Sequence, residues 1–110
     1  MEVRDTINIA IEFARNPGAR YNYEGDNSGQ KFLENLLVPK FEKAVSGNYK
    51  LLIILDGVLG YPSSFVSGSF GKLSLDKGAN LVLKHLTFES NNTLRIQKII
   101  NEIQNPIKKS

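Results

Sequence analysis

The chain has 110 residues, enough for one ordinary domain built around one hydrophobic core. We therefore expect residues 1–110 to form a single domain. The absence of cysteine excludes disulfides, thiolate catalysis and cysteine-ligated zinc. The net charge of +3 is spread along the sequence among acidic residues, a pattern that does not favour nucleic-acid binding. The opening residues lack the apolar stretch of a signal peptide, so we expect a cytoplasmic protein without a membrane segment.

Strict alternation of apolar and polar residues from Ile7 to Phe13 predicts a strand with one buried face. A turn at residues 16–18 follows, and the segment Arg20–Tyr23 alternates again. We expect two strands here, either paired as a hairpin or lying as neighbours in a sheet.

The first long helix is predicted by apolar residues that recur at helical spacing from Phe32 to Val45. A polar loop over residues 25–29 precedes it and supplies N-cap residue types, and Ser46-Gly47 marks its end. Pro39 lies inside this segment, where a proline removes a backbone hydrogen bond and clashes with the preceding turn. We expect a kink or break at this point, with Pro39 opening the second half of the helix.

The segment Leu51–Leu55 is the longest uninterrupted apolar run and is too short to span a membrane. It predicts a central strand buried on both faces. The run stops at Asp56, and a loop then leads to a helix in which Val66, Phe70 and Leu73 share one face. Ser63 or Ser64 stands at the expected N-cap of this helix, which places a hydroxyl group next to the end of a buried strand.

The rest of the chain predicts a short helix, a strand and a last helix. Residues 79–85 can form one or two helical turns, and residues 86–90 alternate as a short strand. Asn91 or Asn92 caps a helix with the apolar stripe Ile96, Ile99, Ile100 and Ile103. The order of elements predicts an α/β fold with a small mixed sheet of about four strands covered by about three helices.

The sequence fits none of the common catalytic patterns. Asp56 ends a buried strand, as acceptor aspartates do, but no neighbouring acidic residue could help it hold Mg²⁺, so an aspartate that anchors its loop is favoured. Gly68–Lys72 does not complete a P-loop, because Leu73 stands where serine or threonine is required. Ser67–Gly71 does not form a nucleophile elbow, because Ser67 replaces its first glycine. His85 is the single histidine, and we interpret it as structural. We therefore expect that the protein has no enzymatic activity, binds no cofactor and has no metal site.

Two features of the helix after the central strand point to binding. A phosphate on Ser63 or Ser64 would add about −1.5 to −2 charges at a helix N-terminus, where an anion is favoured; the alternative is that these serines only cap the helix. The small residues Ser64, Gly68 and Gly71 fall on one side of the helix, which allows close approach to the sheet or to a partner.

Together these residues resemble the bacterial and phage STAS-like domains of uncharacterised function. The most specific part is the strand followed by Asp56-Gly57 and the segment from Gly60 through Tyr61 to Phe65; Phe70-Gly71 and the late strand Leu86–Ser90 extend the likeness over roughly residues 7–104. The resemblance implies a relation to anti-sigma factor antagonists, which use the STAS fold. In these proteins a serine at the start of the helix after the central strand is phosphorylated by a histidine-kinase-like ATPase, and phosphorylation releases that partner.

Carried over by position, the resemblance makes Ser63 or Ser64 the phosphoacceptor. It places the partner-binding surface on the loop and the start of the helix, at Asp56, Gly57, Gly60, Tyr61, Phe65 and Gly68. Phosphorylated antagonists usually have an aspartate directly before the serine pair, and this chain has Pro62 there, so binding without phosphorylation stays open.

The main hypothesis is therefore a regulatory, protein-binding module whose partner is a histidine-kinase-like ATPase or a protein of the anti-sigma factor type. A second hypothesis is a homodimer formed through the small-residue helix or through an exposed sheet edge. A third is a module that binds a small anion or nucleotide at the same helix N-terminus.

Overall fold

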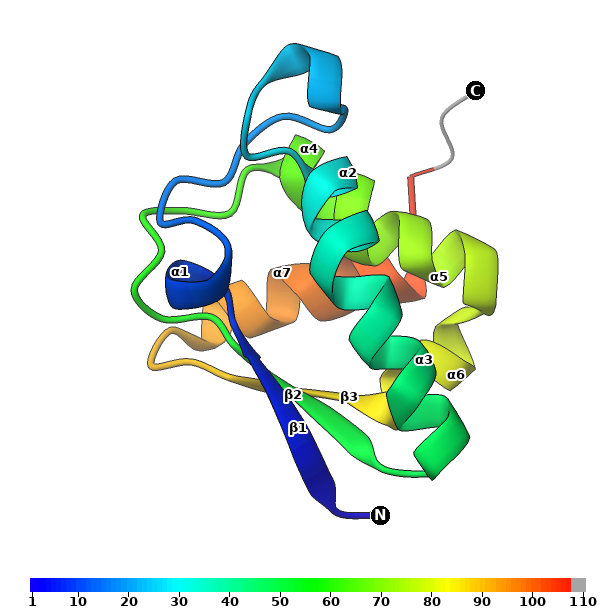
Figure 1. Ribbon diagram of the computed structural model, residues 1–110. Helices are drawn as coiled ribbons and strands as arrows, with labels where there is room; N and C mark the ends of the chain where they lie inside the picture. Colours follow the sequence, from blue (N-terminus) through cyan, green and yellow to red (C-terminus); the bar gives the residue numbers. More distant parts are fainter. Residues whose placement is uncertain (108–110) are drawn as a thin grey trace.

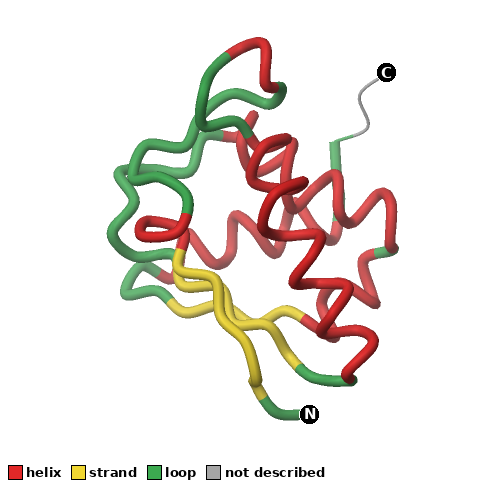
Figure 2. Tube along the Cα trace, viewed as in Figure 1, coloured by secondary structure: helices red, strands yellow, loops and turns green. Residues whose placement is uncertain are grey.

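Three strands form one parallel sheet in the computed structural model, which describes residues 1–107. The strands are β1 (Val3–Asn8), β2 (Lys50–Ile54) and β3 (Leu86–Glu89), and β2 lies between the other two. The helices lie on one side of this sheet (Figures 1 and 2). The predicted α/β class and the central position of β2 are confirmed, whereas the mixed sheet of four strands is wrong because the described residues form three strands that all run parallel. The predicted burial of the central strand on both faces is also wrong: Leu51 and Ile53 are buried under the helices, but Leu52 and Ile54 on the other face are half-buried.

The predicted second strand at Arg20–Tyr23 is absent because a carboxylate occupies its backbone amides. Glu24 accepts hydrogen bonds from the N–H groups of Arg20 at 3.2 Å and Tyr21 at 3.0 Å. These residues lead into a 3-10 turn, η1 (Asn22–Glu24), so no hairpin forms. A strand would need the same amides for its ladder.

The first strand begins earlier and ends sooner than the alternation predicts. At Asn8 the chain turns into a short helix, α1 (Ile9–Glu12), and the Asn8 side chain accepts a hydrogen bond from the N–H of Ile11 at 3.3 Å. The carboxylate of Glu12 accepts one from the N–H of Asn8 at 2.7 Å. This reciprocal cap stops the strand. Ile7 and Ile9 are buried and Ile11 is 81% exposed, so the prediction of a strand over residues 9–13 is wrong.

The first long helix has three parts, α2 (Gly29–Phe32), the π turn η2 (Leu33–Leu37) and α3 (Val38–Gly47). The Ser28 hydroxyl caps it by accepting a hydrogen bond from the N–H of Lys31 at 3.0 Å. Pro39 occupies the first turn of α3, directly after the π turn. The predicted change of helix at this proline is confirmed, because the wider π turn accommodates a residue that cannot donate a regular hydrogen bond.

The helix after the central strand also contains a π turn and runs through α4 (Ser63–Val66), η3 (Ser67–Gly71) and α5 (Lys72–Lys77). Its N-cap is Pro62, so the predicted capping by Ser63 or Ser64 is wrong. The short helix α6 (Ala79–His85) and the last helix α7 (Thr93–Gln104) follow as predicted. Asn92 caps α7, and Ile99 and Ile103 are buried.

The two long helices cross with almost no side chain between them. A Cβ atom on Gly29 would lie 2.5 Å from the backbone oxygen of Phe65 and 2.9 Å from the carbonyl carbon of Gly68. A Cβ atom on Gly68 would lie 2.8 Å from the backbone oxygen of Arg20. Phe32 and Phe65 pack beside this crossing with ring centroids 5.6 Å apart. The small-residue side of the second helix is thus used inside the protein.

We predict that Gly29→Ala lowers the free energy of unfolding by about 1–3 kcal/mol, because the added methyl group meets backbone atoms that cannot rotate away. Urea denaturation followed by circular dichroism measures this. Gly18→Ala is the matched control, since a Cβ there meets no atom within 4 Å, and it should change stability by less than about 1 kcal/mol. Equal effects of the two substitutions would show that the helix crossing tolerates a side chain.

Candidate functional site

The carboxyl ends of the three strands meet at one edge of the sheet, which we call the carboxyl edge. Helix α1 follows β1 there, the loop of residues 56–62 follows β2, and the turn of residues 90–92 leads from β3 into α7 (Figure 1, left). In open parallel sheets ligands and partners bind at this edge, because the loops that it carries are held by a rigid scaffold. The predicted site residues from Asp56 to Ser63 lie in this region.

Asp56 ties the loop after β2 to the turn after β3. Its carboxylate accepts a hydrogen bond from the hydroxyl of Ser90 at 2.8 Å and two from the N–H of Asn91, at 3.1 and 3.0 Å. The interpretation of Asp56 as a loop-anchoring aspartate is confirmed. Gly57 follows with φ of +87° and faces the Cβ atom of Ala10, so the chain needs a glycine to pass α1 here.

Tyr61 anchors the other end of the loop from inside the protein. The ring is buried, and its hydroxyl donates a hydrogen bond to the backbone oxygen of Leu55 at 2.7 Å. Burial raises the pKa of the Tyr61 phenol above its ordinary value, which the nearby Arg95 guanidinium partly opposes. The phenol therefore stays protonated and serves as a structural donor.

Two cations of α7 hold the loop from the outside. Arg95 lies over the Tyr61 ring, 5.4 Å from its centroid, and donates to the backbone oxygens of Val58 at 2.8 Å and Leu59 at 3.3 Å. Lys98 donates to the backbone oxygen of Tyr61 at 2.6 Å. Sequence reasoning missed both cations. The available signal was their spacing of three residues, which puts them on one side of a helix beside its apolar stripe.

Three large aliphatic side chains project from the carboxyl edge. Ile11 of α1 is 81% exposed, Leu59 of the loop 74% and Leu94 of α7 77%. We call these residues the edge patch. Their segments are tied together: the N–H of Leu59 donates to the backbone oxygen of Arg15 at 2.7 Å, and its own oxygen accepts from Arg95. Single exposed leucines are ordinary, and here three large aliphatic side chains are exposed on adjoining segments of one edge.

The two serines occupy different environments. Ser63 is exposed and adjoins a groove of about 450 Å³ that is also lined by Val66, Lys98 and Asn101. Ser64 is half-buried. Of the two predicted phosphoacceptors, Ser63 is thus the more exposed residue.

The predicted partner-binding residues divide into surface and core. Gly57 is exposed, and Asp56 and Gly60 are half-buried. Tyr61 at the end of the loop, Phe65 in α4 and Gly68 in η3 are buried. These three residues therefore lie beneath the surface, whereas Ile11, Leu59 and Leu94 are exposed at this edge.

Groups typical of catalytic and metal sites do not gather at this edge. Residues 1–107 contain no cluster of three or more histidine, cysteine, aspartate or glutamate side chains that could hold a metal ion. In the same part of the chain no helix has both the length and the apolar character needed to cross a membrane. His85 is buried, lies edge-on to Phe41, and has its Nδ1 atom 2.8 Å from the backbone oxygen of Tyr49. Its surroundings are those of a structural histidine.

Comparison with protein families gives one match that includes this site. The model of a family described as a STAS-like domain of unknown function matches residues 28–93, which are 66 of the 110 residues. The matched segment contains the loop of residues 56–62 and both serines. Neither the curated proteins nor the solved structures gave a match.

We predict that Tyr61→Phe destabilises the protein by about 1–2 kcal/mol at neutral pH, because the backbone oxygen of Leu55 loses a buried donor. The pH dependence should change as well. Because the pKa of Tyr61 is raised on folding, the wild-type protein loses additional stability as the pH rises above the unfolded tyrosine pKa of about 10, and the variant lacks this loss.

Urea denaturation between pH 7 and 11 measures both effects. Tyr23→Phe is the matched control, because Tyr23 is 84% exposed. Parallel pH profiles for the wild type and Tyr61→Phe would contradict the assignment of Tyr61 as a buried anchor.

Proposed function

We propose a function from the premise that the chain belongs to the family of STAS-like domains of unknown function, whose model it matches over more than half of its residues. The protein is a non-enzymatic, regulatory binding module, and a protein partner docks on the edge patch and on the loop of residues 56–62. The observation that carries this proposal is the exposure of Ile11, Leu59 and Leu94 at one edge of the sheet.

The anchoring of the loop supports a docking role. Asp56 anchors the start of the loop and Tyr61 anchors its end. Arg95 binds the backbone oxygens of Val58 and Leu59 in its middle. A surface that is already ordered loses little conformational entropy when a partner binds. Leu59 is thus presented to solvent on a fixed backbone, as an apolar anchor for a pocket on the partner.

The rim of the patch suggests the chemistry of the partner. Arg15 and Arg95 flank Leu59 on its two sides, each hydrogen-bonded to the loop backbone. A partner with an apolar pocket surrounded by acidic groups fits such a rim. Resemblance to anti-sigma factor antagonists indicates a histidine-kinase-like ATPase or an anti-sigma factor type of protein as this partner.

Ser63 is the residue through which such binding could be switched. Ser63 is exposed, and Lys98 and Glu102 line the same groove. A phosphate there would add about −1.5 to −2 charges and would attract Lys98 away from the backbone oxygen of Tyr61. Because that contact holds the end of the loop, phosphorylation is proposed to loosen the docking surface and weaken binding.

Site-specific photocrosslinking tests the docking surface. A photoreactive phenylalanine analogue is placed at Leu59, at Leu94 or, as a control, at the equally exposed Tyr23 in η1, and is irradiated in lysate of the source cells. We expect one ATPase or anti-sigma factor type of protein to crosslink from positions 59 and 94 and not from 23. Labelling from all three positions alike, or from 23 alone, would refute the proposed surface.

With the recovered partner, Leu59→Ser should weaken binding about 10- to 100-fold, since it removes a central apolar anchor, while Tyr23→Ser should leave binding unchanged. Isothermal titration calorimetry measures both. An unaltered affinity of Leu59→Ser would exclude the edge patch as the binding site.

The switch is tested separately. Ser63→Asp should weaken binding at least about tenfold, because a negative charge is added beside the contact, and Ser63→Ala should bind like the wild type. Incubation of the protein with its partner and ATP, followed by intact-mass and peptide analysis, locates any phosphate. A phosphate on Ser64 alone would overturn the assignment of Ser63.

A further inference from the structure

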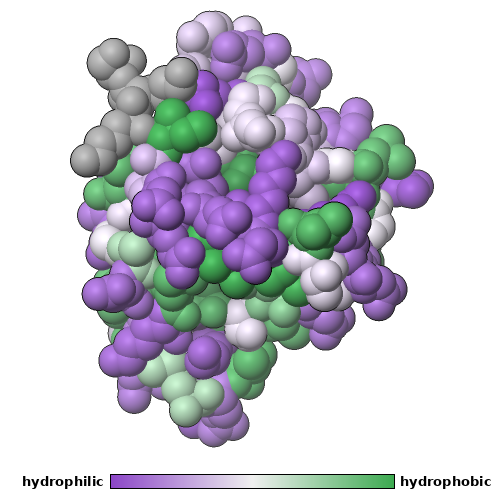
Figure 3. Space-filling model, turned by 180° about the vertical axis from the view of Figure 1, so that it is seen from behind, coloured by the Kyte–Doolittle hydropathy of each residue, from purple (hydrophilic) through white to green (hydrophobic). Residues whose placement is uncertain are grey.

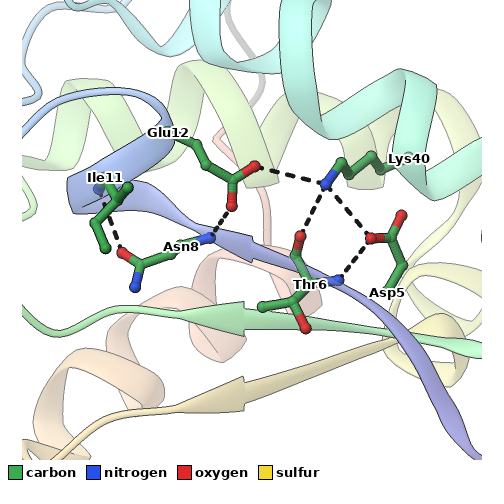
Figure 4. A network of polar contacts seen from close by, with 6 residues as sticks. All are labelled: Asp5, Thr6, Asn8, Ile11, Glu12 and Lys40. Atoms are coloured by element: carbon green, nitrogen blue, oxygen red, sulfur yellow. Dashed lines mark hydrogen bonds and ion pairs between the residues drawn. The ribbon is translucent and has the colours of Figure 1, made fainter.

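The outer edge of β1 is closed by side chains of the chain itself (Figure 4). The N–H of Thr6 donates to the Asp5 carboxylate at 2.8 Å, and the carbonyl oxygen of Thr6 accepts from the Lys40 ammonium at 2.9 Å. The N–H of Asn8 donates to Glu12 at 2.7 Å. Lys40 is itself paired with Asp5 at 3.4 Å and Glu12 at 3.5 Å. Charged side chains that occupy the backbone groups of an edge strand prevent another strand from pairing with it.

The outer edge of β3 has the opposite character. The N–H of Leu55 donates to the carbonyl oxygen of Glu89, so Glu89, and with it Thr87, directs its backbone groups towards β2. Because successive residues of a strand point their backbone groups in opposite directions, the groups of Phe88 point away from the sheet, together with the carbonyl oxygen of Leu86 and the N–H of Ser90. Among residues 1–107 these four groups have no hydrogen-bond partner.

We propose that this edge pairs with the β3 edge of a second copy of the chain. The two β3 strands run antiparallel about a two-fold axis at Phe88 and make a six-stranded sheet in the order β1-β2-β3-β3-β2-β1. The two Phe88 residues exchange both of their backbone hydrogen bonds, and each Leu86 carbonyl oxygen accepts from the Ser90 amide of the other copy. All the open backbone groups of the edge are then satisfied.

The structure favours a second copy because the edge is self-complementary and the assembly closes. Pairing of β3 with β1 of another copy would produce an open chain of subunits, but the network around Lys40 blocks β1. Only the two-fold arrangement uses the open edge and leaves the closed one alone. This inference does not rest on the proposed function.

The side chains of β3 suit this register. Thr87 lies opposite Glu89 of the other copy, so no like charges face each other, and the two Phe88 rings form a cross-strand aromatic pair. Phe88 is half-buried and is held from inside by Phe70, with ring centroids 5.8 Å apart. Figure 3 shows the molecule from behind, on the side opposite to β1. On this side green hydrophobic surface extends below a band of hydrophilic side chains.

The register makes a charge test possible. Thr87→Glu places two carboxylates opposite each other at both symmetry-related positions and should lower the association constant about tenfold, whereas Thr87→Lys should raise it. The double variant T87E/E89K restores opposite charges and should dimerise like the wild type or better. Thr6→Glu is the matched control, because Thr6 lies in the same row of the sheet on the closed edge strand and should leave association unchanged.

Sedimentation equilibrium at protein concentrations from about 10 µM to about 1 mM measures association. This range suits the weak association expected of a contact with about four hydrogen bonds. Amide hydrogen exchange by NMR over the same range should show Phe88 and Ser90 becoming protected as the concentration rises. A monomer throughout, with Phe88 exchange independent of concentration, overturns the proposal. A dimer that Thr87→Glu and Thr87→Lys affect equally, or not at all, overturns it too, because its contact then lies elsewhere.

Discussion

Parallel pairing of β2 with both of its neighbours is the constraint on which the rest of the structure depends. Parallel strands cannot be joined by a tight turn, so each connection crosses back over the sheet as helices, and these cover one face. The same pairing brings the ends of all three strands to one edge. Segments that are far apart in the sequence, such as α1, the loop of residues 56–62 and the start of α7, become neighbours there (Figure 1).

The chain orders this edge with polar contacts that lie mostly behind its surface. Asp56 and Tyr61 fix the two ends of the loop, and Arg95 and Lys98 satisfy its carbonyl groups. The charged groups of this arrangement hydrogen-bond mainly to backbone groups. Ile11, Leu59 and Leu94 project from this polar support into solvent.

A sheet of three strands has two edges, and this chain treats them differently. On β1 Lys40 donates to the outward carbonyl oxygen of Thr6 and the carboxylates of Asp5 and Glu12 accept from the outward N–H groups, while on β3 the outward backbone groups point to solvent. A small sheet gains stability from additional strands, and an open edge next to a closed one allows growth in a single direction. The docking surface proposed at the carboxyl edge and the pairing surface proposed on β3 are thus separate consequences of one topology.

The sequence by itself determined the features that depend on local periodicity. The apolar run Leu51–Leu55 specified the central strand, Pro39 located the change of helix, and the isoleucine stripe specified α7. Predictions failed where two local signals competed. The alternation over residues 7–13 predicted a strand, but the cap formed by Asn8 and Glu12 starts a helix there. In the expected second strand, Glu24 accepts the hydrogen bonds of the backbone amides.

Only the tertiary structure decided which residues form the surface. Arg95 meets the loop 36 and 37 residues earlier in the chain, and Ile11 and Leu94 reach the edge of Leu59 through strand pairing. The tertiary structure also leaves Ser63 exposed and Ser64 half-buried, and it places Phe65 and Gly68 in the core. Periodicity reports which side of an element is apolar, but exposure depends on what packs against that side, and this is set by contacts between distant segments.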